Sequence, residues 1–227
     1  MEYEIVGGAF PLVKCKLNKG ERMKDESGAM AYMTPGIKMD TNTGGGLLKG
    51  LGRALAGDTL FINFFTAERD GEEIGFSSYF PGKIIPIKLE GSQSIIGQKS
   101  SFLAAEDGIE IDMYFRKKLG AGLFGGEGFI LQRFSGNGMV FLEIDGDVVE
   151  KTLAPGETLI VNNGHVAALD ETVDFDIQRV KGVKNIVFGG EGLFFAKMTG
   201  PGRVWLQTMP VCKLAEAIVP FIPKKEE

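Results

Sequence analysis

The sequence has few of the residues on which metal, disulfide and acid-base sites most often depend. It contains two cysteines, one histidine and one tryptophan among 227 residues. Two cysteines are too few for a disulfide scaffold or a paired-cysteine metal site, and one histidine excludes metal sites built from several histidines. We expect Cys15 and Cys212 to be reduced thiols, with a disulfide between them as the alternative.

Long apolar runs and an excess of positive charge are also missing. No stretch reaches the roughly 18 uninterrupted apolar residues of a membrane-spanning helix. The first ten residues, MEYEIVGGAF, lack the basic region and apolar run of a secretory signal. A net charge of −5, from 30 acidic and 25 basic residues, argues against broad electrostatic capture of nucleic acid or an anionic membrane. These absences predict a cytoplasmic location.

Internal repetition is the most informative feature that is present. The twenty residues GGEGFILQRFSGNGMVFLEI, from Gly125, match GGEGLFFAKMTGPGRVWLQT, from Gly189, at eight positions with a shift of 64. The same shift aligns FLAAEDGIEID, from Phe102, with VAALDETVDFD, from Val166. An earlier copy, MAYMTPGIKMD from Met30, follows the same pattern at a different offset. Three copies of one supersecondary unit are therefore predicted.

The local pattern in each copy predicts β-strands. Apolar residues alternate with polar ones around Ile37, Ile109 and Val173, as in half-buried strands. The 33 glycines gather in turn motifs such as SGNG and TGPG, and the pairs Pro81-Gly82 and Pro155-Gly156 suit type II turns. We expect an all-β chain of three tandem β-sandwich repeats.

We predict one compact domain over residues 1–227, with repeats at about 1–95, 96–160 and 161–210. A unit of this size buries too little apolar surface alone, so the three copies should share a core around a pseudo-threefold axis. The tail differs, because the apolar residues of PVCKLAEAIVPFIP share one helical face. This spacing predicts a short helix over residues 211–222 that docks on the body.

Several of these motifs together resemble a known family. They are the threefold repeat, the two GGEG motifs, the glycine-rich segment 41–58 and the PGE turn followed by VNNGHVAALD. The resemblance is to the family once catalogued as domain of unknown function 124, now grouped with the altered-inheritance-of-mitochondria proteins, and it covers nearly the whole chain. It implies a fold similar to the tryptophan RNA-binding attenuation protein. It implies no catalytic residue, and this chain lacks the Arg-rich transit peptide expected of a mitochondrial member.

The glycine-rich segment TNTGGGLLKGLGRALAGD is the first repeat's longer version of a connection made three times. It has no Ser or Thr after its lysine and no surrounding βαβ pattern, so a phosphate-binding loop is not indicated. Its leucines share one helical face with the two basic residues opposite. The segment either covers a sheet edge or contacts a protein partner or membrane surface, and its candidate interaction residues are Leu47, Leu48, Leu51 and Leu55.

Two trios of carboxylates occupy equivalent positions of the repeats: Asp40, Asp112 and Asp176, and Asp58, Glu127 and Glu191. Around a threefold axis either trio could hold a hard cation such as Ca²⁺ or Mg²⁺. The alternation places the first trio opposite the apolar face, so solvent exposure or a local turn hydrogen bond is the simpler interpretation of both trios.

Catalysis and RNA binding have weaker support in the sequence. His165 lies in a predicted turn, where a structural role fits better than that of a catalytic base. The densest basic cluster, RKKLG from Arg116, is short, and most phenylalanines fall at core positions instead of beside positive charge.

We expect a non-enzymatic binding or scaffold protein, without a cofactor, that associates with a protein, a membrane surface or other copies of itself. The alternative is a small-ligand- or metal-binding enzyme that uses clustered carboxylates.

Overall fold

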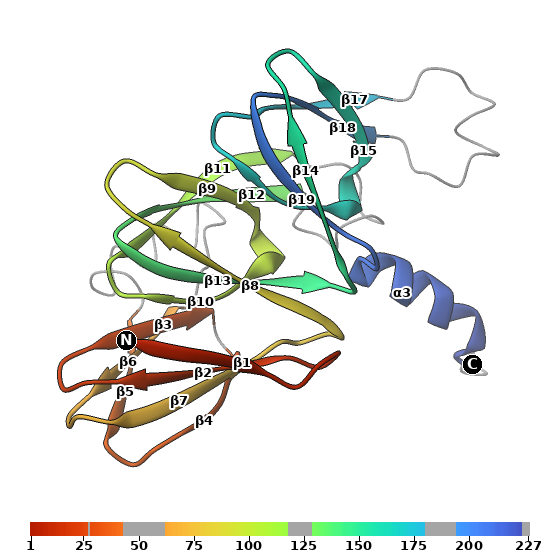
Figure 1. Ribbon diagram of the computed structural model, residues 1–227. Helices are drawn as coiled ribbons and strands as arrows, with labels where there is room; N and C mark the ends of the chain where they lie inside the picture. The colour runs from red at the N-terminus through yellow and green to blue at the C-terminus, as the bar shows by residue number, and fades with distance from the viewer. Residues whose placement is uncertain (27, 43–61, 118–128, 180–193, 224–227) are drawn as a thin grey trace. The chain divides into compact units, whose positions relative to one another are not determined.

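The chain folds almost entirely into antiparallel strands, with one α-helix close to its C terminus (Figure 1). The computed structural model describes residues 1–26, 28–42, 62–117, 129–179 and 194–223. These residues pack as two compact units. Unit 1 consists of Met1–Gln93, Ser100–Ile111 and Phe134–Glu143, and unit 2 of Ser94–Lys99, Asp112–Arg133 and Ile144–Glu227.

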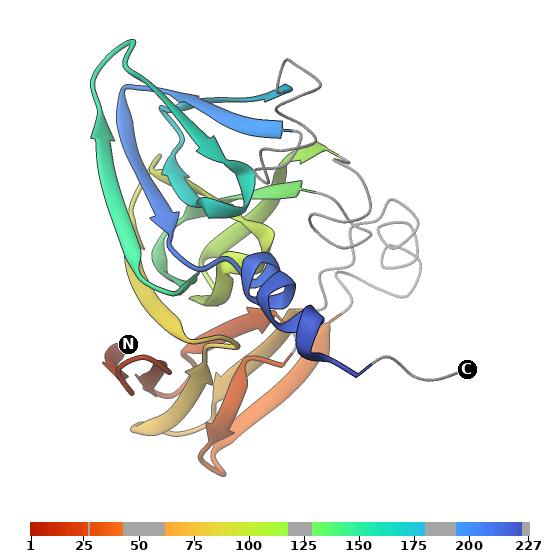
Figure 2. The ribbon, with the colours of Figure 1, turned by 90° about the vertical axis from the view of Figure 1, so that its right-hand side faces the viewer.

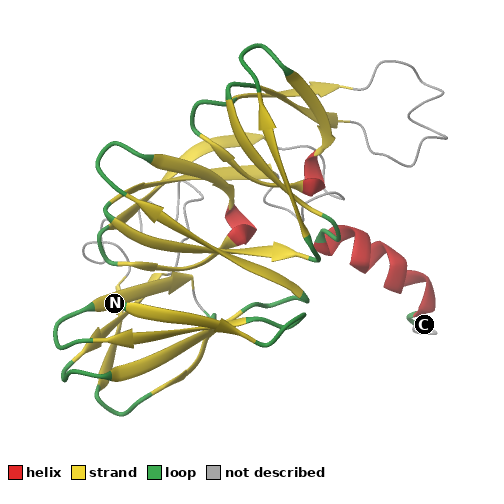
Figure 3. Cartoon of the chain, in the orientation of Figure 1, coloured by secondary structure: helices red, strands yellow, loops and turns green. Residues whose placement is uncertain are grey.

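Nineteen strands lie in the described part of the chain (Figure 3). The first two are β1 (Glu2–Val6) and β2 (Leu12–Leu17). The next six are β3 (Arg22–Glu26), β4 (Met30–Met33), β5 (Ile37–Asn42), β6 (Ile62–Ala67), β7 (Glu72–Ser77) and β8 (Gly82–Leu89). Six more are β9 (Ser94–Gln98), β10 (Phe102–Glu106), β11 (Ile109–Lys117), β12 (Phe129–Gly136), β13 (Gly138–Asp145) and β14 (Val148–Leu153). The last five are β15 (Thr158–Asn162), β16 (Val166–Asp170), β17 (Asp174–Arg179), β18 (Phe194–Thr199) and β19 (Gly202–Gln207).

Helical turns are few and short. The 3₁₀ turns η1 (Lys99–Ser101) and η2 (Asn163–His165) precede β10 and β16. After β19 come α3 (Val211–Ile218) and the 3₁₀ turn η3 (Val219–Phe221). The predicted C-terminal helix is therefore confirmed, and its α-helical part ends two residues before Pro220, which cannot continue an α-helix.

The strands form two six-stranded sheets with the same internal order. One sheet runs β5-β6-β3-β10-β13-β8 and the other β11-β12-β9-β16-β19-β14. Adding six to each strand number of the first sheet gives the second. Two smaller sheets, β1-β2-β7-β4 and β15-β18-β17, contain the remaining strands. Figure 2 shows β14 beside β19, which pair at one end of the second six-stranded sheet.

An irregularity recurs at the same place in three strands. The register shifts between Met30 and Tyr32 in β4, between Phe102 and Ala104 in β10, and between Val166 and Ala168 in β16. A β-bulge inserts one extra residue and bends its strand locally. The shared bulge identifies β4, β10 and β16 as structurally equivalent strands.

Each unit has its own apolar core, supplied by alternate residues of its strands. The core of unit 1 includes Val13, Leu17, Met23, Phe65, Ile74, Phe76, Leu103 and Phe141. That of unit 2 includes Ile96, Phe129, Leu131, Val166, Leu169, Val173, Met198 and Val204. The expected alternation does not extend to Met39 on β5 and Met113 on β11, which are 41% exposed, whereas Ile37 and Ile109 on the same two strands are buried.

Glycine allows the tight turn in SGNG. Gly136 has a φ of +103°, and a Cβ there would lie 2.3 Å from the carbonyl oxygen of Gly108. Gly156, with a φ of +78° and open space around it, suits the predicted type II turn. That prediction is wrong at Pro81-Gly82, because Gly82 has no positive φ and instead begins β8, where its N–H donates to the Ala9 carbonyl.

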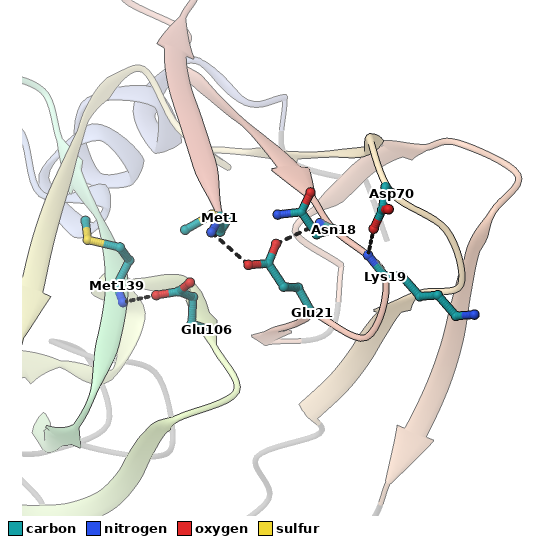
Figure 4. A network of polar contacts seen from close by, with 7 residues as sticks. All are labelled: Met1, Asn18, Lys19, Glu21, Asp70, Glu106 and Met139. Atoms are coloured by element: carbon teal, nitrogen blue, oxygen red, sulfur yellow. Dashed lines mark hydrogen bonds and ion pairs between the residues drawn. The ribbon is translucent and has the colours of Figure 1, made fainter.

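A polar network in unit 1 holds the first residue of the chain (Figure 4). The Met1 ammonium group lies 2.9 Å from Oε1 of Glu21, and Oε2 of Glu21 accepts the Asn18 N–H at 2.7 Å. The hydrogen bond from Asn18 and the Met1 ammonium lower the pKa of Glu21, although burial partly opposes them. The network therefore fixes the entry of β1 beside the β2–β3 turn.

The single pseudo-threefold domain stays a prediction. The strand numbering and the bulges do show that one pattern of pairing is used more than once.

Candidate functional site

Backbone hydrogen bonds fix the short segment of residues 208–210, which leads from the end of β19 to α3 and is called the exit of β19 below. The Thr208 N–H donates to the Asp147 carbonyl at 3.0 Å, and the Met209 N–H donates to the Asp145 carbonyl at 3.1 Å. Pro210 is buried and stands at the N-cap of α3, where it offers no side-chain acceptor. The N–H of Val211, at the start of the helix, therefore needs an acceptor from elsewhere in the chain.

Asp145, at the end of β13, supplies that acceptor. Its Oδ2 accepts the Val211 N–H at 2.9 Å. Burial raises the pKa of this carboxyl, while the hydrogen bond from Val211 lowers it. A carboxylate at this place also interacts favourably with the positive end of the helix dipole. Asp145 thus anchors the N terminus of α3 to the sheet.

Close packing completes the anchor. A Cβ built on Gly164 would lie 3.3 Å from the sulfur of Cys212 and 3.6 Å from Cβ of Pro210. The first turn of α3 therefore rests on the glycine of η2. Cys212 is half-buried here, and burial raises the pKa of its thiol.

Beyond this first turn the helix is exposed, and no residue of α3 is buried. The prediction that its apolar face docks on the body is wrong, because that face is largely open to solvent. We define the C-terminal apolar segment by its exposed large side chains: Val211, Ile218, Val219, Phe221 and Ile222, which are 39%, 49%, 61%, 84% and 58% exposed. Val211, Leu214 and Ile218 are spaced as on one helical face. Figure 1 shows α3 continuing from β19 to the C terminus.

The single histidine, His165, belongs to η2, the turn whose Gly164 contacts the start of α3, and it has a structural role. Nδ1 of His165 lies 2.7 Å from the Gln207 carbonyl oxygen, which can only accept, so Nδ1 carries the proton. The buried Gln207 side chain donates to the Gly164 carbonyl at 2.7 Å, and its Oε1 accepts the Asp145 N–H at 3.3 Å. His165 and Gln207 hold η2 and the exit of β19 together.

The first carboxylate trio lies at exposed positions on three different sheets. Asp40 on β5 is 3.3 Å from Lys38, and Asp176 on β17 accepts the N–H of the following residue, Ile177, at 2.7 Å. Asp112 lies on β11. In the described part of the chain, no group of three or more His, Cys, Asp or Glu residues could hold a metal ion. Asp58, Glu127 and Glu191 lie outside the described residues.

Other predicted features lie wholly or partly outside the described residues. These are the candidate interaction residues Leu47, Leu48, Leu51 and Leu55, and the basic cluster RKKLG beyond Lys117. Both cysteines are free thiols, Cys15 buried and Cys212 half-buried. Among the described helices none is long and apolar enough to cross a membrane.

Sequence reasoning missed Asp145 and the exposure of the helix. One available signal was Phe221 and Ile222, which continue the apolar pattern beyond Pro220, where an α-helix cannot carry them onto the same face.

Comparison with known proteins identifies the family. A family model described as mitochondrial biogenesis AIM24 matches residues 3–209. The chain belongs to the AIM24 family. This confirms the resemblance read from the repeat and glycine motifs. The AIM24 match ends just before α3, so family membership says nothing about the C-terminal apolar segment.

Two streptococcal proteins are similar along nearly their whole length. An uncharacterized protein of Streptococcus pyogenes serotype M6 is 28% identical over 222 residues, covering 94% of this chain and 88% of that protein. A Streptococcus pyogenes protein of known crystal structure has a TM-score of 0.81 at 24% identity, covering 97% of this chain and 99% of that one. The structural likeness confirms the all-β fold, and neither relative's description states an activity.

Proposed function

We propose that this AIM24-family chain is a non-enzymatic binding protein that docks the C-terminal apolar segment into a groove on a partner protein. The observation that carries this proposal is an amphipathic helix anchored at one end by Asp145 and exposed along its apolar face. An anchored helix loses less freedom on binding than a free peptide, so more of its contact energy contributes to affinity.

The spacing of the apolar side chains suits recognition of a helix in a groove. Val211, Leu214 and Ile218 stand at positions i, i+3 and i+7, and Phe221 and Ile222 extend the segment. Such anchors are typical of amphipathic helices that bind apolar grooves of other proteins. Full burial of one such side chain contributes about 1.5–3 kcal/mol.

A protein partner fits the charges better than a membrane does. Helices that lie on membranes usually carry several Lys or Arg residues on the polar face. The polar side of α3 has one lysine, Lys213, and one glutamate, Glu216. The chain as a whole carries a net charge of −5, which opposes binding to anionic lipid. The alternative of an enzyme with clustered carboxylates has no comparable support, because no group of three or more His, Cys, Asp or Glu residues in the described part of the chain could hold a metal ion.

The test compares the wild type with an Ile218→Asp, Phe221→Asp variant. Each protein is used to capture partners from its own organism, and the captured protein is then purified and titrated against both forms. We expect the variant to bind at least about 100-fold more weakly, since two buried apolar side chains together contribute roughly 3 kcal/mol or more.

Phe10→Asp is the matched control, because Phe10 is 72% exposed but lies in unit 1, away from α3 in the chain. It should bind like the wild type. Equal affinity of the Ile218→Asp, Phe221→Asp variant would contradict the proposal. So would binding to neutral or anionic vesicles that this variant abolishes, because the segment would then recognise lipid.

A further inference from the structure

Three strands, β2, β8 and β14, hold equivalent places in their sheets. Each pairs with the strand that lies beside a bulged strand: β2 with β7, β8 with β13 and β14 with β19. Each also ends at a buried leucine: Leu17, Leu89 or Leu153. In the turn that follows, the first backbone N–H donates to a side chain three residues further on: Asn18 to Glu21, Glu90 to Gln93 and Ala154 to Glu157. The shared turn aligns the three strands residue by residue.

The alignment puts three residues at one position, three places before the leucine: Lys14, Pro86 and Glu150. In β14 this position directs its backbone N–H and C=O away from β19. The Thr208 N–H donates to the Asp147 carbonyl at 3.0 Å, so Asp147 faces β19 and alternation turns Glu150 to the other side. The Val148 N–H, which alternation also turns outward, donates to Oδ1 of Asp147 at 2.9 Å.

The outer edge at this position differs among the three strands. In β2 it is covered by β1, where Glu4 pairs with Lys14 and its Oε2 lies 2.5 Å from the lysine Nζ. In β8 the position is Pro86, and a proline on an edge strand offers no N–H to an added strand. In β14 it is Glu150, which is exposed, and no described strand pairs with the outer edge of β14. Of these three edges in the described part of the chain, only that of β14 is both uncovered and unblocked.

The pairing of β1 with β2 indicates what an added strand would place beside β14. Two pairs matter: Ile5 with Val13, which is equivalent to Val149, and Glu4 with Lys14, which is equivalent to Glu150. Val149 is 41% exposed, so an apolar residue opposite it would remove apolar surface from water. Glu150 has the opposite charge to Lys14, so the residue opposite it should be basic where β1 has a glutamate. The Trp205 indole N–H donates to Oε2 of Glu150 at 2.9 Å, which holds the carboxylate in place for such a contact.

A second copy of β14 fits this edge poorly. In an antiparallel pair, outward-facing residues lie opposite outward-facing residues. The two such registers that pair most of β14 with itself place Glu150 opposite Glu150 or Lys151 opposite Lys151. Like charges directly opposite each other are destabilising, so the added strand should have a different sequence.

We propose that the outer edge of β14 binds an extended segment of a partner protein. The segment pairs antiparallel with residues 148–152 and places an apolar residue opposite Val149 and a lysine or arginine opposite Glu150. Main-chain hydrogen bonds to the outward-facing residues supply affinity, and the two side-chain pairs supply specificity. This site is separate from α3 and does not rest on the proposed binding function.

A synthetic peptide based on β1 tests this site. It has the sequence of residues 1–6, MEYEIV, with the substitution Glu4→Lys, and the control peptide keeps Glu4. Each is added to the full chain up to about 1 mM, and NMR follows the backbone amides. The lysine-bearing peptide should shift the amide signals of Glu150 and Thr152 and slow their hydrogen exchange, because these N–H groups then become hydrogen-bonded. It should bind at least about threefold more tightly than the control peptide.

Three variants of Glu150 separate charge from backbone pairing, and thermal melting shows that each is folded. Glu150→Lys should reverse the preference and bind the control peptide at least about threefold more tightly. Glu150→Gln keeps the N–H without the charge, so it should bind both peptides alike. Glu150→Pro repeats the Pro86 of β8 and removes an N–H that β19 does not use, so it should fold but bind both peptides at least about tenfold more weakly than Glu150→Gln.

Unchanged amides of Glu150 and Thr152 at about 1 mM peptide would overturn the proposal. The same preference in the wild type and in Glu150→Lys would overturn the register, and equal binding by folded Glu150→Pro and Glu150→Gln would show that the peptide does not pair with β14. Light scattering tests for a second copy at this edge. Association of the wild type that Glu150→Pro abolishes would contradict the choice of a partner protein.

Discussion

Removing the Asp145 carboxylate tests whether one hydrogen bond holds α3 in place. Asp145→Ala deletes the acceptor that lies 2.9 Å from the Val211 nitrogen, and Pro210 at the N-cap cannot replace it. Loss of a capping side chain costs about 1 kcal/mol, within a range of roughly 0.5–2. The substitution also removes the desolvation penalty of a half-buried carboxylate, which offsets part of this cost.

Because no residue of α3 is buried, the cost should appear as local opening of the helix with little change in the melting temperature of unit 2. A loss of about 1 kcal/mol raises the population of the open helix roughly fivefold. Hydrogen exchange measured by mass spectrometry on a peptide covering residues 210–219 should show a rate increase of that size.

Asp145→Asn provides the matched control, since its amide oxygen can still accept the Val211 N–H. The Asn variant should exchange close to the wild-type rate. Unchanged exchange in Asp145→Ala would refute the reasoning, and so would equal acceleration in both variants. The Asn variant should also lose one pH effect. Burial raises the pKa of Asp145 above its ordinary value of 3.8, so the folded state binds this proton more tightly than the unfolded state does. The free energy of unfolding of the wild type should therefore fall as pH rises from 3.8 through the raised pKa.

Three further predictions concern turns, thiols and the N-terminal network. Gly136→Ala should lower the free energy of unfolding by clearly more than the roughly 1 kcal/mol of Gly156→Ala in urea titrations, because only the first also meets a carbonyl oxygen; equal losses would contradict this. At pH 8 a maleimide should label Cys212 well before Cys15, since burial raises the pKa of Cys15 to about 12; mass spectrometry of digests would show the opposite order if the burial is wrong. Glu21 should contribute under about 1 kcal/mol to the free energy of unfolding above pH 4.5, and this contribution should be lost as pH falls through the lowered pKa of Glu21. Glu21→Gln should remove it, and a variant whose free energy of unfolding depends on pH as the wild type's does would rule this out.

The strand content could be predicted because it depends on local patterns. Alternation around Ile109 and Val173, with glycines such as Gly136 at the turns, dictates which segments become strands. The recurring motifs at a shift of 64 identified the family on the same local grounds. The C-terminal helix was predicted for the same reason, since its apolar spacing is a property of consecutive residues.

Contacts between distant residues could not be predicted in this way. The helical spacing of Val211, Leu214 and Ile218 shows that they share a face but not what that face touches, so its exposure became clear only from the tertiary structure. Asp145 lies 66 residues from the helix that it anchors, and no local pattern connects the two. Likewise, β3 pairs with β10 and β9 pairs with β16, although the paired strands are far apart in the sequence. Local periodicity decided the kind of each element, whereas burial and pairing decided which faces and edges remain free to bind.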